Sequence, residues 1–143
     1  MKKTNFILLA FTALATIACH FESFDERCER ETREYTQKQC PRRLDEYTIM
    51  DSTVYDTPTR TITYYYTFEK ALDDANQLTE DIKEKFREQL CKNVINSIEL
   101  KAYKEKELNF RYLYHSQTTG KVLFETVITP EDYGKGKLRN PEE

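Results

Sequence analysis

The chain has 143 residues, a formal net charge of −3 at pH 7 and 33% charged residues, with ten tyrosines, eight phenylalanines and no tryptophan. This length corresponds to one domain, and the aromatic content with few Gly and Pro residues excludes a low-complexity chain. The three glycines, Gly120, Gly134 and Gly136, lie near the C-terminus, so no glycine-rich loop can cradle a phosphate at the start of a helix. Two histidines, His20 and His115, leave little scope for metal or serine-hydrolase chemistry.

Residues 1–18 predict a secretory signal peptide. Lys2 and Lys3 supply positive charge, and the stretch from Phe6 to Ala18 is uncharged and mostly apolar. It is too short to span a bilayer comfortably, and strongly charged sequence follows directly. We therefore expect residues 1–18 to be removed on export, the alternative being a buried N-terminal helix or a short anchor.

The apolar stretch ends in Thr16-Ile17-Ala18-Cys19, which resembles the lipobox of bacterial lipoproteins. In that family a small residue precedes the cysteine whose sulfur receives a diacylglyceryl group. The resemblance implies lipid attachment at Cys19 with more than one acyl chain, such as palmitate, which suffices for stable anchoring. It predicts a membrane-anchored lipoprotein on the periplasmic or surface face of the bacterial envelope. Thr16 stands where an aliphatic residue is usual, and plain cleavage after Ala18 by the ordinary signal peptidase is the rival.

Removal of residues 1–18 takes two lysines and no acid, which leaves 20 basic against 25 acidic residues and a charge of −5. An acidic surface is repelled by nucleic acid and by anionic lipid headgroups. We therefore expect contact with the membrane through the lipid anchor, a protein partner, and no nucleic acid.

The periodicity predicts a first helix over residues 21–39. Its apolar side chains recur near one face: Phe21, Phe24, Cys28 and Tyr35. Pro41 prevents continuation, so the helix should end near Gln39. A weak strand over residues 47–56 and a turn over 56–59 follow.

Residues 61–68 form the clearest strand pattern. Ile62, Tyr64, Tyr66 and Phe68 share one face, and Thr61, Thr63, Tyr65 and Thr67 share the other. Such a strand is expected to be half buried.

A second helix should begin at Thr79, which is an acceptable N-cap, and present an apolar stripe from Ile82 to Ile98. A charged stretch over residues 101–107 separates it from a hairpin of strands, 108–114 and 122–128. After Pro130 no apolar period remains, so residues 131–143 should form a flexible tail.

The predicted order is α-β-β-α-β-β. Two hairpins on either side of a helix favour an α+β fold with a four-stranded antiparallel sheet and helices packed on one face. Residues 19–130 then form a single lipoprotein domain.

Three cysteines remain after Cys19. If residues 21–39 are helical, Cys28 and Cys40 lie about 18 Å apart along the axis, whereas a disulfide needs Cα atoms within about 7 Å. Any bridge should therefore involve Cys91, with Cys28–Cys91 slightly favoured over Cys40–Cys91. Three buried free thiols are the alternative. No CxxC spacing or histidine partner indicates zinc.

Catalytic chemistry has little support in the sequence. His115 lies in a predicted loop without a visible partner for general-base work. The adjacent carboxylates Asp73-Asp74 and Glu80-Asp81 diverge on a helix rather than converge. We therefore expect no enzyme activity, no cofactor and no metal site.

A partner-binding surface is the main functional hypothesis. If the helices cover the face of Tyr64 and its neighbours, four side chains fall on the opposite face: Tyr65, Leu113, Leu123 and Val127. Exposed apolar groups clustered on a sheet indicate a binding site. The alternatives are that the N-terminal segment covers this face, or that these residues are scattered singly on the surface.

Several segments between residues 38 and 130 resemble a group of small bacterial envelope proteins: Cys40-Pro41, Tyr64 to Thr67, Cys91, and the hairpin from Phe110 to Thr129-Pro130. The acidic residues Glu22, Asp25 and Glu26 after Cys19 are similar to export signals of Bacteroidota surface lipoproteins. The resemblance implies no active site. The sequence thus predicts a non-enzymatic, protein-binding accessory or assembly subunit. The alternative is a periplasmic inhibitor or immunity protein against a toxin or lytic enzyme.

Overall fold

The computed structural model describes residues 21–134. The predicted signal peptide and Cys19 lie outside these residues. In chain order the elements are α1 (Phe24–Gln39), β1 (Arg42–Arg43), β2 (Thr48–Asp56), β3 (Thr61–Phe68), the 3-10 turns η1 (Lys70–Asp73) and η2 (Ala75–Gln77), α2 (Glu80–Asn96), α3 (Lys101–Glu105), β4 (Asn109–Ser116), β5 (Val122–Ile128) and α4 (Pro130–Gly134).

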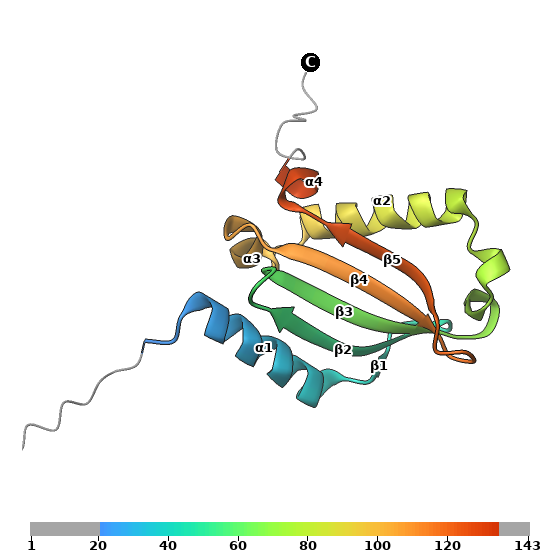
Figure 1. Cartoon of the computed structure of the whole chain (residues 1–143), viewed down its shortest axis with the longest axis horizontal. Coiled ribbons are helices and arrows are strands. Elements are labelled where there is room, and N and C mark those ends of the chain that lie inside the picture. Colours follow the sequence, from blue (N-terminus) through green and yellow to red (C-terminus); the bar gives the residue numbers. More distant parts are fainter. Residues whose placement is uncertain (1–20, 135–143) are drawn as a thin grey trace, which may run out of the picture.

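The strands of the described region form one five-stranded sheet in the order β1-β2-β3-β4-β5 (Figure 1). Strands β3 and β4 are parallel, and the other neighbours are antiparallel. The predicted four-stranded antiparallel sheet is therefore wrong, although the fold is α+β. The chain between β3 and β4 passes through η1, η2, α2 and α3, and this long crossover returns it to the end of the sheet where β3 began. The short strand β1 adds the fifth member.

Two long helices pack on one face of the sheet. Helix α1 lies along β2 and α2 lies along β5, near opposite edges (Figure 1). Both contribute to a single core cluster with the same strand face, whose fully buried members are Cys28, Ile62, Phe68, Val94, Leu108, Phe110 and Ile128.

The helix ends follow local capping chemistry. Ser23 Oγ accepts the N–H of Glu26, and the Glu26 carboxylate accepts the N–H of Ser23, which together form a capping box before α1. The predicted end of this helix at Gln39 is confirmed, with Pro41 two residues beyond. The predicted N-cap Thr79 accepts the N–H of Ile82.

The sequence pattern did not predict the two short helices α3 and α4. In α4, Tyr133 is buried, its ring lies 5.8 Å from that of Phe110, and its hydroxyl donates to the Leu108 carbonyl at 2.9 Å. The prediction of a flexible tail is therefore wrong for residues 131–134. The buried ring of Tyr133 holds this single helical turn in place, although the segment has no repeating pattern of apolar residues.

Tyrosines fill the centre of the helix-covered face. Rings stack across the parallel pair, with Tyr64 and Tyr112 at 5.1 Å and Tyr66 and Tyr114 at 4.6 Å between centroids. Burial raises the pKa of all four hydroxyls. The prediction that these residues belong to the core is confirmed.

The structure contains Cys28, Cys40 and Cys91 as free thiols and does not support the predicted Cys28–Cys91 disulfide or its Cys40 rival. Helix α1 packs over β2 and α2 over β5, and strands about 4.8 Å apart place these helices about 14 Å from each other. Cys40 ends α1 at the β1 side of the sheet. Burial raises the pKa of the Cys28 thiol to about 11, and it also raises those of Cys40 and Cys91.

Alkylation should distinguish these thiols. We expect iodoacetamide at pH 7.5 to modify Cys40 and Cys91 of the native protein before Cys28. The Cys28 side chain is fully buried, and burial disfavours the reactive thiolate. In denaturant without reductant all three should react, as read by peptide mass mapping. A pair that reacts only after reduction would contradict the free-thiol arrangement.

Candidate functional site

The sheet face opposite the helices is a candidate binding surface, which we call the open face. The strand register aligns two rows of side chains across it: Val54, Thr63, Arg111 and Val127 in one, and Ser52, Tyr65, Leu113 and Glu125 in the other. The structure thus places three of the four predicted partner-binding residues on this face, namely Tyr65, Leu113 and Val127.

Exposure differs among these residues. Val54 is 49% exposed and Val127 is 37% exposed, at the two ends of one row, while Leu113 at the centre is only 6% exposed. Arg111 donates to the Glu125 carboxylate at 2.7 Å, and hydrogen bonding by that carboxylate raises the pKa of Arg111. Leu113 is therefore screened by neighbouring side chains, and the accessible apolar groups are the valines at the margins.

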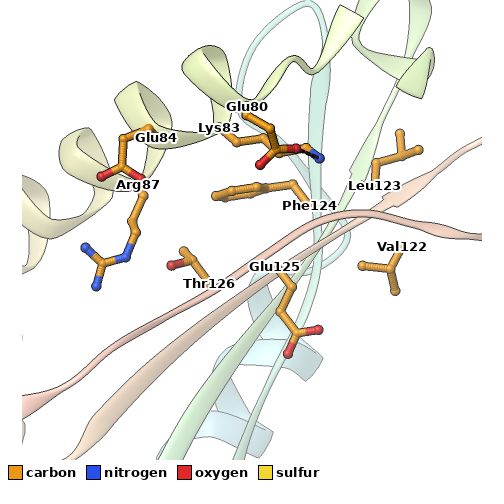
Figure 2. A pocket seen from close by; sticks show the side chains of 9 residues that line it. All are labelled: Glu80, Lys83, Glu84, Arg87, Val122, Leu123, Phe124, Glu125 and Thr126. Atoms are coloured by element: carbon orange, nitrogen blue, oxygen red, sulfur yellow. Dashed lines mark hydrogen bonds and ion pairs between the residues drawn. The ribbon is translucent and has the colours of Figure 1, made fainter. Parts of the chain in front are cut away.

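Leu123 does not share this face, so that part of the prediction is wrong. The pairing shifts between Tyr114 and His115, opposite Phe124 and Val122, and leaves Leu123 without a partner in a β-bulge. A bulge inserts one residue and reverses the alternation beyond it. Figure 2 shows Leu123 and Phe124 on the helix side of the strand and Val122 on the other side, and Leu123 packs against the core.

A groove of about 290 Å³ runs between α2 and β5 (Figure 2). Its lining residues are Glu80, Lys83, Glu84 and Arg87 from α2 and Val122 to Thr126 from β5. Within the helix, Lys83 donates to Glu80 at 2.8 Å. The groove has an apolar floor at Leu123 and Phe124 and charged walls, and it borders the open face at β5.

One charged pair fixes the wall of this groove. Arg87 donates to Asp132 of α4 at 3.0 Å, and Asp132 also accepts the backbone N–H of Thr129 at 2.8 Å. Burial opposes ionisation of Asp132, but these hydrogen bonds outweigh it and lower its pKa. The Arg87 guanidinium is thereby held against α4 and not free to swing into the groove.

This pair should make stability pH-dependent. Because the pKa of Asp132 is lowered in the folded state, its contribution is fully present above the unfolded value near 3.8 and is lost progressively as the pH falls from that value through the lower folded-state pKa. We expect Asp132→Asn to lower the free energy of unfolding by about 1–2 kcal/mol at pH 7. Urea unfolding at pH 7 and pH 3 should show the difference from wild type shrinking at pH 3. An equal difference at both pH values would contradict this assignment.

His115 and Asp73, which were considered for chemistry from the sequence, make contacts within the fold. His115 stacks on Tyr65 with ring centroids 6.4 Å apart. Asp73 accepts the backbone N–H and the hydroxyl of Thr118, at 3.0 and 2.6 Å, and so holds the β4–β5 hairpin turn. In residues 21–134 no group of three or more His, Cys, Asp or Glu side chains is placed to hold a metal ion. None of the helices in this same region has the length and apolar character needed to cross a membrane.

Comparison with known proteins identifies a family. The family model described as "Domain of unknown function (DUF8479)" matches residues 23–124, a span from the cap of α1 to the bulge in β5. The chain belongs to this family. No curated protein matches the chain. A solved structure from Pseudomonas aeruginosa, described as a "putative secreted protein", has the same fold with a TM-score of 0.65 and 11% identity, covering 76% of this chain and 91% of that one.

The α2–β5 groove and the exposed edge of β5 were not predicted from the sequence. Both depend on β5 lying at the end of the sheet, and strand order is not visible in the alternation pattern. No local signal marked β5 as an edge, because β5 lacks the Pro and Lys residues that natural proteins use to protect edges, and β2, β3 and β4 lack them as well.

Proposed function

We propose that the chain is a bacterial envelope protein, anchored through a lipid on Cys19, that acts by binding another protein and performs no chemistry of its own. The N-terminal signal and lipobox-like sequence support the location. The structural neighbour described as a secreted protein fits an extracellular or envelope place. The partner is another envelope protein, which makes the chain an accessory or assembly subunit.

One observation carries the binding role: the open face presents exposed valines at both ends of a row that crosses β2 to β5. Val54 and Val127 end this row. Val122, which lies on the same face at the opposite end of β5 from Val127, is 49% exposed. Burying such side chains against a partner yields about 25 cal/mol per Å² of apolar surface. The central ion pair Arg111–Glu125 supplies polar specificity between the valines.

The test is capture from detergent-solubilised envelope of the native host by the tagged full chain. The variant is Val54→Lys with Val122→Lys, which places charges on the open face without touching the core. The matched control is Ile98→Lys, because Ile98 is 87% exposed and lies away from this face. We expect one envelope protein to be lost with the double variant and retained with the control.

Equal capture by both variants would overturn the proposal. Capture of nothing from host envelope, followed by binding of an added foreign toxin or lytic enzyme, would instead establish the inhibitor role.

A further inference from the structure

We infer that the exposed edge of β5 binds an extended segment of another protein as an added strand, whose side chains on one side enter the α2–β5 groove. This inference rests on the proposed function and names the form of the partner. Addition of a strand to a free sheet edge is a recurring mode of peptide recognition.

The direction of the backbone groups follows from the hydrogen bonds of β4. Asn109 N–H donates to the Arg60 carbonyl at 3.0 Å, and Gln117 N–H donates to the Phe68 carbonyl at 3.1 Å. Backbone groups alternate in direction along a strand, so the odd-numbered residues of β4 bond toward β3 and the even-numbered ones bond toward β5.

The same alternation fixes β5. Its residues opposite the even-numbered members of β4 are Ile128, Thr126 and Phe124, which therefore direct their N–H and C=O groups into the sheet. Glu125 and Val127 direct theirs outward. No hydrogen bond joins these outward groups to any other residue of the described region. They offer two donors and two acceptors to an added strand.

The two edges of the sheet differ. Strand β1 has two residues, both arginine, and is too short to template a partner. Strand β5 has seven residues, and its bulge is confined to the end near Leu123, which leaves residues 125–128 regular. An extended segment can therefore pair on the β5 side.

The charges favour a basic segment. Three charged side chains near the groove have ion-pair partners. Lys83 pairs with Glu80, Arg87 pairs with Asp132, and Glu125 pairs with Arg111. Glu84 has no partner within ion-pair distance in residues 21–134, although its charge acts on Arg87 one turn along the helix. The groove lining therefore holds three carboxylates, those of Glu80, Glu84 and Glu125, against the two cations Lys83 and Arg87, and its charge is negative. We therefore expect Lys or Arg in the bound segment, alternating with apolar residues.

A second copy of the chain fits this edge less well. Antiparallel self-pairing of the whole strand Val122–Ile128 in full register would place Glu125 opposite Glu125. Like charges directly opposite each other destabilise a strand pair. This full register is therefore disfavoured, and the negative charge of the groove lining points to a different, basic polypeptide as the occupant.

The test uses the full chain in detergent and the synthetic peptide fluorescein-Thr-Val-Lys-Val-Lys-Val-Thr-amide, whose N-terminal dye reports binding by fluorescence anisotropy. The decisive variant is Val127→Pro, because proline removes an outward donor without removing a bond to β4. Its matched control, Val127→Ala, shortens the side chain and keeps the N–H. The unfolding midpoint of each variant is measured, and Glu125→Pro serves as a second variant if Val127→Pro fails to fold.

We expect Val127→Pro to weaken binding at least tenfold and Val127→Ala to weaken it less than threefold. A peptide with Glu in place of Lys should bind at least tenfold more weakly than the original. Bound peptide should also slow amide exchange at Glu125 and Val127. The absence of binding at millimolar peptide, or equal binding by both position-127 variants, would overturn the inference.

Capture of the envelope partner distinguishes failure of this inference from failure of the proposed function. If the envelope partner is captured equally by wild type and Val127→Pro but lost with Val54→Lys and Val122→Lys, the edge inference is wrong and the open-face role stands. If no variant changes capture, both are wrong.

Discussion

Replacing Phe110 with alanine is expected to lower the free energy of unfolding by about 3–5 kcal/mol, because truncating a buried aromatic side chain leaves a cavity. Phe110 is fully buried, pairs with Ile62 on β3 and Ile128 on β5, and contacts the ring of Tyr133. It thus joins the parallel pair, the edge strand and α4. Such a loss is a large part of the stability of a domain, which is about 5–15 kcal/mol.

Urea unfolding followed by circular dichroism measures this effect, with Val127→Ala as the control. Val127 lies on the open face and is 37% exposed, so its truncation should change stability by about 0.5 kcal/mol or less. A cost below about 1 kcal/mol for Phe110→Ala would mean that this position is not in a packed core.

Replacing Lys104 with methionine is expected to cost about 1.5–3 kcal/mol, the range for hydrogen bonds made by a charged group. Lys104 Nζ donates to the carbonyls of Val94, Ile95 and Ser97 at 2.8, 2.7 and 2.9 Å. These carbonyls lie at the end of α2, where a helix lacks internal donors and carries partial negative charge. The lysine therefore fastens α3 to the end of α2.

The matched control is Lys101→Met. Lys101 lies one turn earlier in α3, its side chain is 73% exposed, and its ion pair with Glu105 spans 3.9 Å. We expect a change within about 0.5 kcal/mol for this exposed position. Thermal unfolding of both variants measures the difference. Equal losses would show that Lys104 has no special role in ending α2.

Local features of the fold were predictable from local chemistry. The bounds of β3 and β5 match residues 61–68 and 122–128 because alternation is read residue by residue. The start of α2 at Thr79 follows because a hydroxyl N-cap acts within one turn.

Features that depend on distant pairing were not predictable in this way. The alternating pattern of residues 109–116 is the same whether β4 runs parallel or antiparallel to β3, so the sequence offered no sign of the crossover. Leu123 illustrates the same limit at the scale of one residue, since its bulge depends on the register with β4. The outward direction of the Glu125 and Val127 backbone likewise requires the strand order. The lipid at Cys19 stays a prediction.

We propose that a protein partner docks on the β5 side of the sheet. Site-specific photocrosslinking in living cells tests it most directly, with p-benzoylphenylalanine at Val122 or Val127 in the full chain and at the exposed α2 residue Lys92 as control. We expect a discrete adduct of higher mass, containing one envelope protein, from each β5 position and none from position 92. No adduct from β5, or the same adducts from all three positions, would contradict it.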